Sequence, residues 1–210
     1  MRYDSKSLVK ASRFVDWFPL HEETFKSEVY NRIDELVMAE AEYCDKGNYK
    51  HLANIFTALA VYWTLRRHGA TEEEAYNTVS SVVWEYVEKH MAPDYRKISK
   101  AGFFFPLIRK MLPTMFAKGS GYGWKYTWHP EEPKHRLRFE CNSCIYAQIL
   151  PKYGAPKLGG IFCHCDILNY GELYDIDFIR TETLCQTGND CNFLFVKHPR
   201  EETFTRTKSI

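Results

Sequence analysis

The chain has 210 residues, which is enough for one domain with a small appendage, since domains average about 150 residues. Hydrophobic residues make up 45% and charged residues 26%, values typical of a globular protein and not of a disordered one. The 28 basic residues nearly balance the 27 acidic ones. A nucleic-acid partner is therefore not expected, because binders of the phosphate backbone usually carry a clear basic excess.

The sequence holds no run of about 20 apolar residues, the length that a membrane span requires. Its first residues also lack the apolar segment of a secretory signal. We therefore expect a cytoplasmic protein that has no membrane partner and acts on a small molecule. A homo-oligomer is compatible with this composition.

The first half of the chain has helical periodicity. Apolar residues recur at steps of three and four over residues 21–46, and residues 50–68 are apolar nearly all round, which predicts a central helix. Thr71 and Glu74 form the pattern of a capping box, which predicts that a third helix starts there and continues to residue 90.

A fourth helical segment is expected over residues 95–116. Pro106 and Pro113 each remove a backbone donor, so an interrupted helix is predicted. The glycine-rich stretch 118–123 then ends the helical pattern and marks the boundary of an N-terminal part, residues 1–118.

After this boundary the periodicity changes to that of strands with short helices between them. The predicted elements are strands at 124–129 and 136–139, a helix at 144–153, a strand at 161–165, a helix at 166–173, and two antiparallel strands at 176–183 and 191–196.

Helices that precede strands favour an α+β fold. We expect an N-terminal helical layer packed on a C-terminal, mainly antiparallel sheet with short helices. Residues 1–118 and 119–198 would form one integrated domain, and residues 199–210 a polar tail.

Cysteines concentrate in the C-terminal part. Thiolates suit zinc and iron–sulfur clusters, although buried cysteines also behave as small hydrophobic residues. No cofactor is certain from this pattern. The candidate ligands, of which a subset would bind a metal, are Cys141, Cys144, Cys163, Cys165, Cys185 and Cys191.

Three of these residues also suit other chemistry. Cys144 lies near a predicted helix start, where the pKa of a thiol falls. Cys163 and Cys165 would share one face of a strand and so one pocket or metal, with His164 on the other face. Asp166, at the predicted strand-to-helix junction, would either cap the helix or act as a base.

Two further predictions concern charged side chains. Arg180 falls within a predicted apolar strand, so it must be paired, either in a structural ion pair or with an anionic substrate. The helical histidines are expected to be surface or capping residues; they are His51, His68 and His90.

The spacing of several of these residues resembles that of the L-2-amino-thiazoline-4-carboxylic acid hydrolase family. The elements that carry the resemblance are Cys144, Cys163-x-x-Asp166, Arg180-x-x-Thr183 and Cys191-Asn192-Phe193.

The resemblance implies a hydrolase that opens a small cyclic amidine or thiazoline ring, by attack of water or of a cysteine on the amidine carbon, and yields an N-carbamoyl amino acid. It implies catalytic roles for Asp166 as base, Cys163 as nucleophile or metal ligand, and Thr183. It further implies that the substrate is bound by Arg180 as carboxylate clamp, Cys144 and Asn192.

A second resemblance supports an alternative from another functional class. Glu182-x-x-Cys185 followed by Cys191 is similar to the zinc-binding corner of 4-vinyl reductase domains. It implies a non-catalytic, metal-stabilised module that binds a small molecule.

Overall fold

The structure is a computed structural model that describes residues 2–186 and 188–198. The predicted polar tail at 199–210 lies outside the described residues. Within the described chain, no helix is both long enough and apolar enough to cross a membrane.

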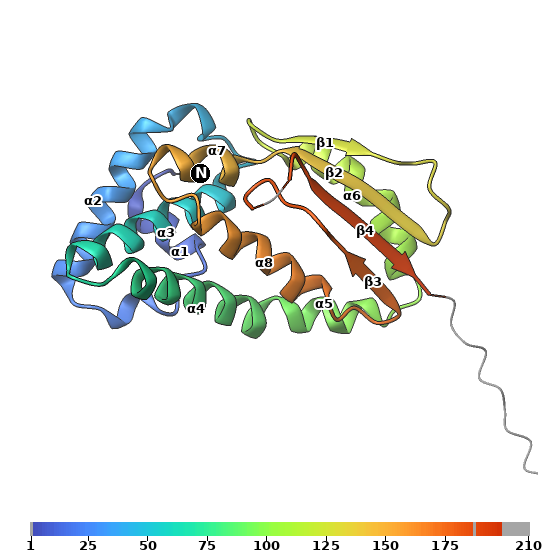
Figure 1. The fold of residues 1–210 in the computed structure, drawn as a ribbon, viewed down its shortest axis with the longest axis horizontal. Helices are drawn as coiled ribbons and strands as arrows, with labels where there is room; N and C mark the ends of the chain where they lie inside the picture. The colour runs from blue at the N-terminus through green and yellow to red at the C-terminus, as the bar shows by residue number, and fades with distance from the viewer. Residues whose placement is uncertain (1, 187, 199–210) are drawn as a thin grey trace, which may run out of the picture.

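The N-terminal part is helical, as predicted (Figure 1). Its elements are α1 (Ser5–Ala11), the short 3-10 helix η1 (Phe18–Leu20), α2 (Glu23–Ala39), a second 3-10 helix η2 (Ala41–Tyr43), α3 (Tyr49–Arg67), α4 (Glu72–His90), α5 (Ala92–Ser99) and α6 (Phe104–Gly119).

Helix α3 is central because it is apolar on nearly every side, which confirms the prediction. Its side chains at Leu52, Ile55 and Leu59 are inaccessible to solvent, and α1, α2 and α4 pack around it. The capping box that starts α4 is also present: the Glu74 N–H donates to Thr71 Oγ1, and the Thr71 N–H donates to the Glu74 carboxylate.

The interruption predicted within 95–116 occurs at a different position. Helix α5 ends at Ser99 and α6 starts at Phe104, so the break precedes both prolines. Pro106 lies in the first turn of α6, where proline removes no helical hydrogen bond, and Pro113 lies inside the helix.

The C-terminal part contains a four-stranded antiparallel sheet with the order β1-β2-β4-β3. The helix-then-sheet order confirms the α+β class. Strand β3 ends before the predicted limit, since residues 180–183 continue as a loop. The strands are β1 (Lys125–Trp128), β2 (Arg136–Ser143), β3 (Ile176–Ile179) and β4 (Cys191–Lys197).

Two helices join the strands, α7 (Ile145–Lys152) and α8 (Leu158–Tyr170). The first confirms the helix predicted at 144–153. The second contradicts the predicted strand at 161–165, because those residues lie in one continuous helix with most of residues 166–173. Helix α8 packs against α4, where the indole N–H of Trp84 donates to the Ile161 carbonyl at 3.0 Å.

Buried side chains form two clusters. The first, called the helical core, surrounds α3 and includes Leu52, Phe56, Leu59, Val83 and Ile149. The second, called the aromatic core, lies between the sheet, α6 and the end of α8, and includes Phe105, Leu137, Phe139, Leu173 and Phe195.

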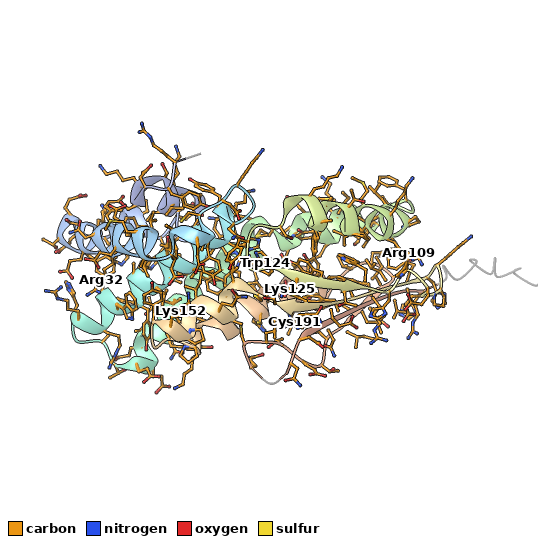
Figure 2. All side chains as sticks on the ribbon, turned by 90° about the horizontal axis from the view of Figure 1, so that it is seen from above. Arg32, Arg109, Trp124, Lys125, Lys152 and Cys191 are labelled. Carbon is orange, nitrogen blue, oxygen red and sulfur yellow. The ribbon has the colours of Figure 1, made fainter. Side chains whose placement is uncertain are left out.

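The two faces of the sheet differ. One face contributes Phe139 and Phe195 to the aromatic core and is covered by α6 and α8. The other face carries exposed polar side chains such as Arg138 and Asn142. Figure 2 shows α6 on one side of the sheet, and the helical layer beside the strands.

Candidate functional site

Helix α8 positions the predicted catalytic residues. Asp166 follows Cys163 by three residues, so both side chains lie on the same side of the helix. Cys165 lies on another side, where it is 1% exposed and its thiol donates to the Ile161 carbonyl at 3.3 Å. The prediction that Cys163 and Cys165 share a face is therefore wrong, because it assumed a strand. Asp166 is within the helix and does not cap it.

Arg180 forms a buried ion pair with Asp166. Its Nη1 donates to Asp166 Oδ2 at 2.7 Å and its Nη2 to the Cys163 carbonyl at 2.8 Å. The arginine side chain is only 5% exposed, and its guanidinium carbon lies 5.8 Å from the ring centroids of both Phe178 and Phe193. Of the two alternatives for Arg180, the structure contains the ion pair.

The environment of Asp166 brings the pKa of its carboxyl close to neutral pH. Burial raises the pKa to about 6, although the cations of Arg180 and Arg13 act in the opposite direction. The side chain nevertheless keeps 32% of its surface accessible. Its Oδ1 has no hydrogen-bond donor in the described part of the chain and is not enclosed. Asp166 therefore has a partly accessible carboxylate, of which Oδ2 is held by Arg180.

Four thiols lie close together beside this pair. Cys144 precedes the first residue of α7, as predicted. Hydrogen bonds from the thiols of Cys141 and Cys185 lower the pKa of Cys144 despite its burial, and the backbone N–H groups of Ala147 and Tyr146 add to this effect. The helix start thus favours a thiolate at Cys144.

The pKa values of the other three thiols shift in different directions. The neighbouring Cys185 thiol and, to a smaller extent, the Thr183 hydroxyl lower the pKa of Cys163. The pKa values of Cys141 and Cys185 are raised, in both cases first by their hydrogen bonds to neighbouring sulfurs. Cys141 and Cys185 therefore keep their protons while Cys144 and Cys163 ionise more easily.

The remaining predicted metal ligands do not complete a metal site. Cys191 is opposite Cys141 in the sheet, and its sulfur accepts the Leu184 N–H at 3.3 Å. Burial raises the pKa of Cys191 to about 12 and that of Cys165 to about 11. Across residues 2–186 and 188–198, no three His, Cys, Asp or Glu side chains form a group that could hold a metal ion.

The other predicted site residues support the loop that follows β3. Asn192 Oδ1 accepts the N–H groups of Thr181 and Glu182 at 2.9 and 3.0 Å, and Nδ2 donates to Thr181 Oγ1 at 2.7 Å. Thr183 is buried, and its hydroxyl lies beside Cys163 and donates to Gln186 Oε1 at 3.3 Å. The structure places Thr183 with Cys163, whereas Asn192 is engaged in holding the loop.

A shallow hollow reaches the thiols from outside. It has a volume of about 600 Å³ and is lined by Cys185, Gln186, Gly160, Lys157 and three residues at the start of α4, Glu72, Glu73 and Tyr76. Gly159 lets Cys185 approach α8, since a Cβ there would lie 2.7 Å from the Cys185 sulfur. The hollow brings solvent to one end of the thiol group.

Arg13, which the sequence analysis did not single out, lies on the opposite side of α8. Its Nη1 donates to Cys165 Sγ at 3.2 Å, and its guanidinium carbon lies 5.8 Å from the centroid of the Phe162 ring. The other guanidinium nitrogens have no acceptor within the described chain and are not enclosed. The cation nevertheless acts on the pKa of Asp166. Arg13 is therefore a cation with free donors whose charge reaches Asp166.

His51 was predicted to be a surface or capping residue, and this prediction is wrong. The ring is half-buried in the first turn of α3, 4.8 Å from the Trp124 ring centroid, and Nδ1 lies 3.3 Å from Tyr146 Oη. Burial lowers the pKa of His51 to about 4, against an opposite effect of Cys144. The imidazole is therefore neutral at pH 7 and available for hydrogen bonding.

These groups gather where the helical layer meets the sheet. Trp124 and Cys191 lie near the middle of the molecule at this junction (Figure 2). An ionisable carboxylate, a cation with free donors and two thiols with lowered pKa values suit hydrolysis of a small anionic substrate.

Comparison with known proteins agrees with the sequence resemblance. Neither the curated proteins nor the solved structures include a match. Residues 48–195 match the sequence model of the family described as L-2-amino-thiazoline-4-carboxylic acid hydrolase. The matched segment covers more than half of the chain. It includes Cys144 and Cys163 and the Asp166–Arg180 pair. The chain belongs to the L-2-amino-thiazoline-4-carboxylic acid hydrolase family.

Proposed function

We propose that this protein hydrolyses a small cyclic amidine of the 2-aminothiazoline-4-carboxylate type, with Asp166 as the general base. The observation that carries the proposal is the state of Asp166: its pKa is about 6, Arg180 fixes one carboxylate oxygen, and 32% of the side chain is accessible. A base whose pKa lies near the working pH is both ionised and able to take a proton.

The substrate would be held by its carboxylate. Arg180 was the expected clamp, but its donors are engaged by Asp166 and the Cys163 carbonyl. Arg13 has unused donors on a guanidinium fork, the geometry that binds a carboxylate with two hydrogen bonds. We therefore assign the carboxylate to Arg13 and give Arg180 the task of positioning Asp166.

The reaction proceeds through one added water. Asp166 takes a proton from the water while the water oxygen bonds to the amidine carbon and the C=N π electrons move to the ring nitrogen, which forms a tetrahedral intermediate. The bond between that carbon and the ring sulfur then breaks as the C=N double bond re-forms, the electron pair leaves with sulfur, and the proton held by Asp166 passes to the sulfur. The proton of the new hydroxyl moves to the ring nitrogen as the carbonyl forms. The product is an N-carbamoyl amino acid with a free thiol, so substrate and one water account for all atoms.

Cys163 offers a second route. Its pKa is lowered by Cys185 and Thr183, and a thiolate is a strong nucleophile. On this route the Cys163 sulfur bonds to the amidine carbon as the ring C–S bond breaks, and water later cleaves the new bond. We favour the water route because the Asp166 side chain is 32% accessible and the pKa of its carboxyl lies near neutrality.

The test is turnover of 2-aminothiazoline-4-carboxylate, followed by mass spectrometry of the N-carbamoyl product. Asp166→Asn should lower kcat by a factor of about 10² to 10⁴. Asp177→Asn should leave it unchanged, because Asp177 is an exposed carboxylate on β3 that pairs with His198. Thermal melting checks that both variants are folded.

Three outcomes would change the assignment. A folded Asp166→Asn variant with more than half of the wild-type rate would remove Asp166 as base. Loss of turnover in Cys163→Ser, together with a protein adduct of substrate mass in the wild type, would establish the covalent route. Binding of the ring compound by wild-type protein without any turnover would favour the non-catalytic binding module.

A further inference from the structure

Helix α6 exposes a row of large apolar side chains. Phe103, immediately before the helix, and Leu107, Met111 and Met115 within it are 64%, 41%, 45% and 53% exposed. They follow one another at intervals of four residues, so they lie along one side of the helix. Monomeric proteins seldom expose so continuous an apolar surface without a binding role. We call this row the α6 stripe.

The stripe points away from the protein. The opposite side of α6 packs on the sheet, where Phe104 and Phe105 are buried and Phe116 contacts the rings of Tyr126 and Trp128. Figure 2 shows α6 on the outside of the molecule, with side chains projecting away from the strands. Both sides of α6 therefore carry apolar side chains, and only one of these sides is covered by the protein.

The charged residues in the sequence segment that carries the stripe are all basic, although Glu172 pairs with Arg96 and Glu132 contacts Arg109 from other segments. Residues 95–130 contain no Asp or Glu, although the whole chain has nearly equal numbers of acids and bases. The basic residues of this segment are Arg96, Lys97, Lys100, Arg109, Lys110, Lys118 and Lys125.

Two of these lysines lie beside the α6 stripe. Lys110 and Lys118 are exposed on α6, beside Met111 and Met115, and neither has an ion-pair partner in the described part of the chain. Arg109 differs from them, since its guanidinium turns inward and donates to the Pro130, Glu132 and Arg136 carbonyls at the tip of the β1–β2 hairpin. The outward cations therefore accompany the outward apolar row.

We propose that the α6 stripe docks this protein on the surface of a membrane that contains anionic lipids. Exposed apolar side chains on one side of a helix whose own charged residues are all basic match a helix that lies in the lipid–water interface. The lysine stems can lie along the apolar zone while their ammonium groups reach the lipid headgroups. The expectation of no membrane partner rested on the lack of a spanning segment, and a surface helix needs none.

A second copy of the chain suits the same surface less well. A symmetric contact across the stripe would place Lys110 and Lys118 of both copies in one interface. The absence of Asp and Glu from residues 95–130 leaves those lysines without neighbouring acids. Like charges would oppose such a dimer, whereas anionic headgroups would neutralise them.

The test is sedimentation of the full-length protein with vesicles of phosphatidylcholine alone or with about one-third phosphatidylserine. The proposal predicts binding to the anionic vesicles only, and binding that weakens as salt rises. Met111→Glu should lower the partition coefficient at least tenfold. Lys110→Glu with Lys118→Glu should lower it at least twentyfold, because each lysine near an anionic surface contributes about fivefold.

Met38→Glu is the matched control, since Met38 is 73% exposed but lies on α2. It should bind as the wild type does, and circular dichroism should show that every variant is folded. No binding, or equal binding to both kinds of vesicle, would overturn the proposal. A dimer in light scattering that Met111→Glu converts to a monomer would overturn it in favour of a contact between copies.

Discussion

The two buried clusters of this protein are built differently. The helical core is largely aliphatic and its central residues, such as Leu52 and Leu59, are inaccessible to solvent. The aromatic core is bordered by half-buried rings, among them Tyr126, Phe178 and Phe193. Arg180 lies against two of these rings, whereas Cys144 and Cys165 belong to the helical core, so both clusters border the site.

The candidate site lies between the two cores and draws on both. Arg13 and His51 come from the helical layer, and Arg180 follows a strand of the sheet. Asp166 and Cys163 lie on α8, which packs on α4 of the helical layer and also reaches the aromatic core through Tyr170. Substitutions far from the site should therefore change stability alone, and substitutions beside Arg180 should also change activity.

The largest effect on stability is expected in the helical core. Ile33→Ala removes a fully buried side chain from α2, a helix that contributes no residue to the site. The free energy of unfolding should fall by about 3 kcal/mol, measured by urea denaturation. The kcat/KM of the folded protein should stay at the wild-type value. A loss of kcat/KM in this variant would contradict the expectation that a substitution far from the site changes stability alone.

A smaller effect on stability is expected in the aromatic core, with a loss of activity. Phe193→Leu should cost about 1 kcal/mol and lower kcat/KM about tenfold, because Arg180 loses part of the surface that positions it. Phe195→Leu is the control: it lies on the same face of β4 and is more buried, and it makes no contact with Arg180. Equal losses of activity in both variants would show that only general packing matters.

Local patterns predicted most of the elements. The capping box at Thr71 and the apolar surface of α3 depend on neighbouring residues, so sequence spacing was sufficient to find them. The position of Cys144 at a helix start was predictable for the same reason. The pairing of Arg180 followed from a charge within an apolar segment, but its partner could not be identified.

The errors have physical causes. Residues 161–165 form a short apolar run, which fits a buried strand and a buried helix equally well. The two glycines before it have a low helix propensity, yet at Gly159 the small residue is needed for contact with Cys185. Arg13 meets Cys165 across 152 residues of sequence, and no spacing rule reports such a contact. His51 was misplaced because burial by Trp124 and Tyr146 arises only in the folded chain.

The most direct test of the central claim is the dependence of kcat/KM on pH. Because Asp166 must be ionised to accept a proton from water, kcat/KM should rise with pH from 5 and level off above an apparent pKa of about 6. In Asp166→Asn this rising limb should be absent from the residual activity. A wild-type profile that is flat over this range, or a variant that keeps the same limb, would contradict the assignment of Asp166 as the base.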